Sequence, residues 1–204
     1  MFRSKTKGRQ RKRHGRPRRV EEPLSSFPLG EFSNFPSIRH GSAIVSHGNS
    51  VNRIQRVIIK TLYDLNGHKD AYSVSVAGHD GTYDGEVAFE VGVANGLFFD
   101  YLNAEILKEL CSPLESGKEY SILDFLVIVT YHYSREKKRI PLIFDHHILR
   151  FSFNDGEVEV TLFHSKGTRR MPLDEFLNVI ISRIKVETKS AGLRPINVER
   201  MRTL

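Results

Sequence analysis

The sequence predicts an α+β fold in which helices pack on a small antiparallel sheet, preceded by a disordered basic arm at the N-terminus. Apolar residues recur with helical spacing over residues 51–65 and 173–184. Strict alternation over residues 87–93 predicts a half-buried strand, and an Asp155-Gly156 turn between two alternating runs predicts a hairpin. We expect a single compact domain over residues 49–204 and an arm with a linker over residues 1–48.

The first half of the domain contains one strong helical pattern. Over residues 51–65 the apolar positions follow a 3-4-4-3 spacing, with Ser50 placed as an N-cap and Asn66-Gly67 as a stop. Residues 72–76 and 87–93 alternate as strands do, and residues 102–110 carry a second helical pattern. The sequence therefore predicts helix, strand, strand and helix in this order.

The second half contains one ambiguous segment, residues 120–133. Its apolar positions between residues 122 and 129 fit a helix face, whereas its later part has the Val, Ile, Thr and Tyr composition of a strand. We expect a helix that begins near Glu119 and ends before Ser134. A hairpin over residues 149–162, a helix beginning after Pro172 and a short last strand at residues 196–198 follow.

The charge of the chain is concentrated at its N-terminus. The 204 residues include 31 Lys and Arg against 24 Asp and Glu, a net charge of +7. Residues 1–20 contain ten cations and no acidic residue, so the remaining chain carries a net −3. Like-charged residues without apolar partners cannot collapse, which predicts disorder for this arm. The ten cations are Arg3, Lys5, Lys7, Arg9, Arg11, Lys12, Arg13, Arg16, Arg18 and Arg19.

Residues 21–48 read as an extended linker rather than a packed element. They combine proline, serine and glycine with isolated apolar residues. These apolar points are Phe27, Leu29, Phe32 and Phe35.

Catalytic and metal-binding patterns are weak. The chain has no phosphate-binding glycine loop, no GxSxG, no HExxH and no CxxC, and its single cysteine, Cys111, excludes a disulfide framework within the chain. His132, His146 and His164 lie on neighbouring expected strands, but adjacent His146 and His147 would point to opposite faces. We therefore expect ordinary strand histidines, a buried structural thiol at Cys111, and no catalytic residue, metal or cofactor.

A flexible arm with ten cations predicts a polyanionic partner. Each cation that neutralises a phosphate releases counterions, and the same arm would adsorb to an anionic lipid leaflet. The composition of residues 11–19 also fits a nuclear-import signal. The arm has no interleaved aromatic residues, so base stacking and sequence readout are not expected.

The order of elements from residue 87 onward resembles the matrix proteins of rhabdoviruses. The likeness covers residues 87–192 and is strongest over residues 151–192, where a strand, a turn, a strand, a helix and a basic segment follow one another. Further short stretches are Tyr120-Ser121-Ile122-Leu123-Asp124-Phe125-Leu126 and the end of the last helix, Ile184-Lys185-Val186-Glu187-Thr188-Lys189-Ser190-Ala191-Gly192. The family also places a flexible basic arm before a compact α+β core.

The resemblance implies a non-enzymatic structural protein that self-associates, bridges the nucleocapsid and the membrane, and promotes virion assembly and budding. The implied partners are a second copy of the chain, an anionic membrane, and the viral nucleocapsid or RNA, with the glycoprotein tail and host import or sorting factors as further candidates. The implied locations are the virion, the host cytoplasm and the inner face of host membranes, with the host nucleus as a further candidate.

The sequence departs from the family in its late motif. It has no Pro-Pro-x-Tyr and no Pro-Thr/Ser-Ala-Pro, and its nearest candidates are Phe27-Pro28 and Phe35-Pro36, which could also act as points of apolar insertion. Two other classes stay open: a cellular nucleic-acid-binding module with a disordered basic arm, and an enzyme built around His132, His146 or His164.

Overall fold

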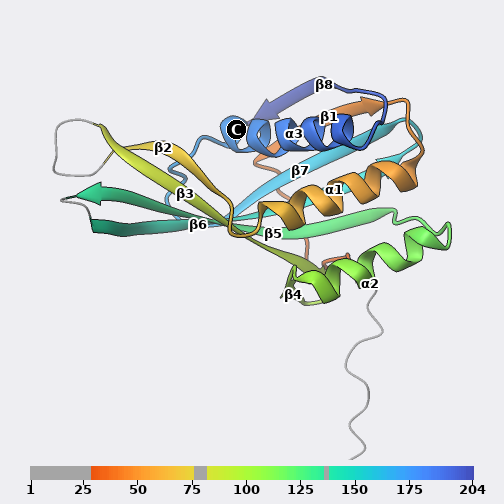
Figure 1. The fold of residues 1–204 in the computed structure, drawn as a ribbon, viewed down its shortest axis with the longest axis horizontal. Helices are drawn as coiled ribbons and strands as arrows, with labels where there is room; N and C mark the ends of the chain where they lie inside the picture. The colour runs from red at the N-terminus through yellow and green to blue at the C-terminus, as the bar shows by residue number, and fades with distance from the viewer. Residues whose placement is uncertain (1–28, 76–81, 136–137) are drawn as a thin grey trace, which may run out of the picture.

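A computed structural model describes residues 29–75, 82–135 and 138–204 of the chain. These residues form three helices that lie on one face of an eight-stranded antiparallel sheet, with the ends of β2, β3, β5 and β6 projecting beyond the helices (Figure 1). The predicted α+β class is therefore confirmed. The basic arm, with Phe27 and Pro28, lies outside the described residues.

The strands follow the order β2-β3-β5-β6-β7-β1-β8, and β4 pairs with β3 beside this path. Every pairing is antiparallel. The elements, in chain order, are β1 (Gly41–His47), α1 (Val51–Leu65), β2 (Lys69–Ser75), β3 (Thr82–Asn95), β4 (Phe98–Tyr101), α2 (Ala104–Glu115), β5 (Ile122–Arg135), β6 (Lys138–Asn154), β7 (Glu157–Lys166), α3 (Leu173–Ser190) and β8 (Ile196–Thr203).

The core lies between the helices and the covered face of the sheet. The apolar stripe of α1 is buried, as the 3-4-4-3 spacing predicts, and α3 buries an equivalent stripe around Phe176 and Ile180. Aromatic residues of the central strands complete this core, among them Phe125 and Phe151, whose rings meet edge to face at 5.9 Å. The predicted helices over residues 51–65 and 173–184 and the hairpin at Asp155-Gly156 are confirmed.

The predicted helix over residues 119–133 is wrong, because this segment is the central strand β5. Leu123, Phe125, Val127, Val129 and Tyr131 alternate along it and are all fully buried under the helices. Ile122, Leu126 and Ile128 on the opposite face are also apolar, so the alternation of burial is hidden in the sequence. When a strand has apolar residues on both faces, some of them fall three or four positions apart by chance, and the sequence pattern then resembles that of a helix.

The prediction of an unpacked linker is wrong for residues 41–47. They form β1, which lies between β7 and β8 and buries Ala43 and Val45. Residues 29–35 also touch the sheet, through bridges at Leu29 and Phe32. The described fold therefore begins at residue 29 rather than at residue 49.

In the described part of the chain, no helix combines the length and the apolar character that a membrane crossing requires.

Candidate functional site: an exposed aromatic hairpin

The chain enters the fold along the turn between β3 and β4. We call residues 29–35 the strap. Leu29 bridges to Asn95 and Phe32 bridges to Gly96, while the amide of Gly30 donates to the carbonyl of Ala94 at 2.8 Å. The strap therefore fixes the point at which the arm joins the folded protein.

The turn and strand beside the strap carry large apolar side chains that face solvent. Phe98 is 71% exposed, Tyr101 57% and Leu97 48%. We call these three residues the hairpin tip. They stay uncovered because β4 is short and pairs only with β3 among the described strands, at the end of the sheet next to α2 (Figure 1). Phe98 and Tyr101 pair with Asn95 and Gly92, so their side chains point to opposite sides of β4. Together with Leu97 they surround the end of this hairpin with exposed apolar groups, which favours an interaction surface.

A buried ion pair holds the strap in place. Arg150 donates from Nε to Asp124 Oδ1 at 2.8 Å and from Nη2 to Asp124 Oδ2 at 2.6 Å. The backbone amide of Phe32 donates to the same carboxylate at 2.8 Å, and Arg150 also donates to the carbonyl of Phe32 at 3.3 Å. The charge-assisted bonds and their bidentate geometry make this the strongest polar anchor of the strap.

Phe35 and Pro36 are half-buried rather than freely displayed. The Arg150 guanidinium lies 4.0 Å from the centroid of the Phe35 ring. Phe32 packs its ring against Phe99 at 4.7 Å. The aromatic residues predicted for insertion in this segment therefore hold the strap on the sheet, and the exposed apolar surface is the hairpin tip.

The sequence reasoning missed the hairpin tip. Leu97, Phe98 and Phe99 directly follow the Asn95-Gly96 turn signal, and an apolar run at a turn is unusual because turn residues are mostly polar. That run is the local signal that could have identified the site.

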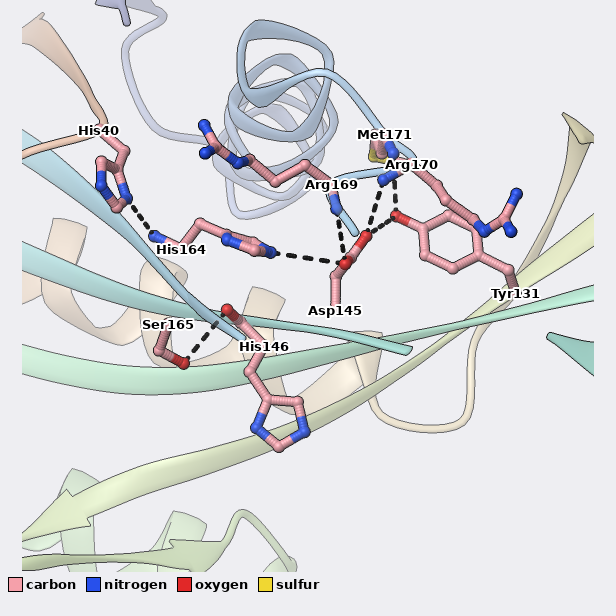
Figure 2. A network of polar contacts seen from close by, with 9 residues as sticks. All are labelled: His40, Tyr131, Asp145, His146, His164, Ser165, Arg169, Arg170 and Met171. Carbon is pink, nitrogen blue, oxygen red and sulfur yellow. Dashed lines mark hydrogen bonds and ion pairs between the residues drawn. The ribbon is translucent and has the colours of Figure 1, made fainter. Parts of the chain in front are cut away.

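The histidines near β6 and β7 surround a second polar cluster, centred on buried Asp145 (Figure 2). Its carboxylate accepts bonds from the Tyr131 hydroxyl at 2.8 Å and from the backbone amides of Arg169 at 2.8 Å and Arg170 at 3.0 Å. His164 Nε2 lies 3.4 Å from the same carboxylate. Burial acts to raise the pKa of Asp145, but these four contacts together hold it below its ordinary value.

The Asp145 cluster fastens the loop between β7 and α3. The amide of Met171 donates to the Tyr131 hydroxyl at 3.0 Å, so three consecutive amides of the loop are bound. Gly167 approaches so closely, with φ at +112°, that a Cβ there would overlap Asp145 Oδ1. The carboxylate serves as a structural anchor because its bonds go to the loop and to neighbouring side chains.

Of the candidate catalytic histidines, His164 contacts the Asp145 carboxylate, whereas the ring of His146 does not. His146 binds Ser165 through its backbone carbonyl and turns its ring away from Asp145 (Figure 2). His147 is fully buried, stacks on Phe176 at 4.2 Å, and has a pKa lowered to about 4 by burial and by the nearby His164. Across the described residues, no three His, Cys, Asp or Glu side chains are grouped to hold a metal ion.

Cys111 lies half-buried on α2, and burial raises the pKa of its thiol. A raised pKa keeps the thiol protonated and lowers its nucleophilicity.

No protein family, curated protein or solved structure matches this chain significantly, so the resemblance to rhabdovirus matrix proteins stays a prediction from the sequence.

Proposed function

We propose that this chain is a non-enzymatic, matrix-like structural protein that bridges a nucleocapsid and a membrane, self-assembles, and promotes virion assembly and budding. The observation that supports it best is the position of the hairpin tip, which lies beside the strap that follows the basic arm. In the sequence the cations precede the strap, and the strap itself lies against the hairpin whose end carries the exposed apolar side chains.

Stable peripheral binding to a membrane requires two signals of this kind. A polybasic segment contributes about 1 kcal/mol per Lys or Arg near an anionic leaflet, but salt screens this attraction. Burying a phenylalanine or leucine side chain contributes a further 1.5–3 kcal/mol or so, independently of charge. The arm supplies the electrostatic contribution to membrane binding, and the hairpin tip supplies the apolar contribution.

The two signals can act on the same patch of bilayer. Arg19 precedes Leu29 by ten residues, and an extended chain of that length spans at most about 35 Å. The nearest cation, Arg19, is therefore tethered within reach of a surface on which the hairpin tip rests, and the other cations precede it along the chain.

Vesicle flotation with a paired variant tests this proposal. Phe98→Ser together with Tyr101→Ser should weaken binding of the full chain to phosphatidylserine-containing vesicles at least tenfold, because the apolar contribution is lost. Val186→Ser is the matched control, since Val186 is 66% exposed on α3, and it should bind as the wild type does. Thermal unfolding followed by circular dichroism checks that all three proteins are folded.

The same experiment separates the two signals. Wild-type protein should release acidic vesicles in 0.5 M NaCl and should not bind purely phosphatidylcholine vesicles, because the arm supplies the attraction over distance. Unchanged binding of the Phe98/Tyr101 variant would refute the proposal that the hairpin tip faces the membrane.

The remaining predicted partners and locations belong to this proposal. They are a second copy of the chain, the nucleocapsid or RNA, the glycoprotein tail and host sorting or import factors, in the virion and at the inner face of host membranes. A cellular nucleic-acid-binding module with the same basic arm would adsorb to acidic vesicles through charge alone, so its binding would not depend on Phe98 and Tyr101, and the paired variant distinguishes the two classes.

A further inference from the structure

The helical layer carries a basic stripe that is separate from the arm. α1 lies between α2 and α3 (Figure 1) and turns Arg53, Arg56 and Lys60 to solvent. These positions differ by three and four residues, so they follow one face of the helix over about 10 Å. A shallow groove of about 240 Å³ runs along this face, and its lining includes these three cations together with Glu187 of α3.

Two cations of this stripe make no ion pair with a described carboxylate. Lys60 binds Asp64 at 2.8 Å and Glu187 at 3.0 Å. Within the described residues, by contrast, neither Arg53 nor Arg56 has a carboxylate at ion-pair distance. The chain outside the arm is net negative, so two unpaired arginines in one groove are a local exception to its charge.

The direction of α1 strengthens the positive potential. Its first turn contains Arg53 and no acidic residue, the Ser50 side chain makes no capping bond, and one carboxylate from outside the helix, that of Glu119, accepts a bond from the amide of Asn52 at 3.1 Å. The amino end of a helix carries a partial positive charge, so a cation there is unfavourable. Arg194, exposed and next to Gly48, adds a further cation near this end. An anion bound in the groove would relieve this repulsion.

We infer that the groove along α1 binds the phosphate backbone of single-stranded RNA, with Arg53 and Arg56 as the principal contacts. Guanidinium groups bind phosphate oxygens in a bidentate manner. The groove lining contains no aromatic residue on which a base could stack, so the contact is independent of sequence. This inference rests on the proposed function, because it assigns the nucleocapsid side of the bridge to a surface of the folded core.

Fluorescence polarisation with a labelled 20-nucleotide oligouridylate tests the inference on the full chain. The logarithm of the association constant falls as the logarithm of the salt concentration rises. For a single strand, each lost phosphate contact makes this slope shallower by about 0.7. Arg53→Gln with Arg56→Gln should therefore reduce the slope by about 1.4 and weaken binding roughly tenfold at low salt. Glutamine keeps the helix propensity of α1 close to that of arginine.

The matched control removes the same charge from another surface. Arg200→Gln with Arg202→Gln changes two exposed arginines on the edge strand β8 and should leave the slope close to that of the wild type. An unchanged slope in the α1 variant, or an equal loss in the β8 variant, would overturn the inference.

Vesicle flotation separates this inference from the proposed function. The α1 variant should bind acidic vesicles as the wild type does. If it instead lost vesicle binding while keeping its RNA slope, the stripe would face the membrane and the inference would be wrong. A failure in the RNA measurement alone leaves the result for the Phe98/Tyr101 variant unaffected.

Discussion

Replacing Asp124 with alanine is expected to lower the free energy of unfolding by about 3–5 kcal/mol, the largest effect of any substitution considered for this protein. The Asp124 side chain is completely buried, whereas that of Arg150 is 22% exposed. Loss of the Asp124 carboxylate would leave the Arg150 guanidinium without its ion-pair partner and the amide of Phe32 without its hydrogen-bond acceptor. Urea denaturation at pH 7 measures this change.

Two further variants identify the cause of this loss. Asp64→Ala removes a carboxylate from the exposed Lys60–Asp64 pair and should cost no more than about 0.5 kcal/mol. Arg150→Met in the Asp124→Ala background should recover part of the stability, because the unpaired charge is removed with its partner. A cost below about 1 kcal/mol for Asp124→Ala would contradict the anchoring role of the ion pair.

Acidification is expected to destabilise the fold through His147. Its pKa is lowered to about 4 in the folded protein by burial and by His164, while an unfolded histidine titrates near 6.5. The unfolded chain therefore binds a proton more readily across this range, and stability is complete above about pH 6.5 and falls as the pH falls toward 4. The expected loss attributable to this residue is about 3 kcal/mol between pH 7 and pH 4.

Substitution of the ring tests this assignment. Phe in place of His147 keeps an aromatic ring against Phe176 and should flatten the dependence of the unfolding free energy on pH. Leu at the same position is a second variant in case the larger ring does not fit. His68→Gln, at an exposed ring, should retain the acid-induced loss. If both His147 variants lost stability as steeply as the wild type, the origin of the acid sensitivity would lie elsewhere.

The sequence predicts those elements whose periodicity arises from one buried face. α1 and α3 are amphipathic, and the strands on either side of Asp155-Gly156 alternate, so one local pattern identifies each of them. β5 has apolar residues on both faces, because it lies in the centre of the sheet, and its pattern does not distinguish a strand from a helix. β1 is short and contains glycine and serine, so only its two neighbouring strands explain its formation.

The candidate site was predicted only in part, for a similar reason. The basic arm is evident from its composition, because charge density is a local property of the sequence. The hairpin tip depends on which surface β4 leaves uncovered, and this is decided by tertiary packing. Likewise, Phe35 reads as a free aromatic residue in the sequence, but it is placed under Arg150 by residues more than a hundred positions away.

Co-flotation of RNA tests the central claim, that one protein bridges a membrane and a nucleic acid. Fluorescent single-stranded RNA is mixed with phosphatidylserine-containing vesicles and the full chain, and its position in a density gradient is measured. The account predicts that RNA rises with the vesicles only when the protein is present, and that the Phe98/Tyr101 variant leaves the RNA at the bottom, bound to protein. RNA and vesicles that displace each other from the wild-type protein would contradict the account.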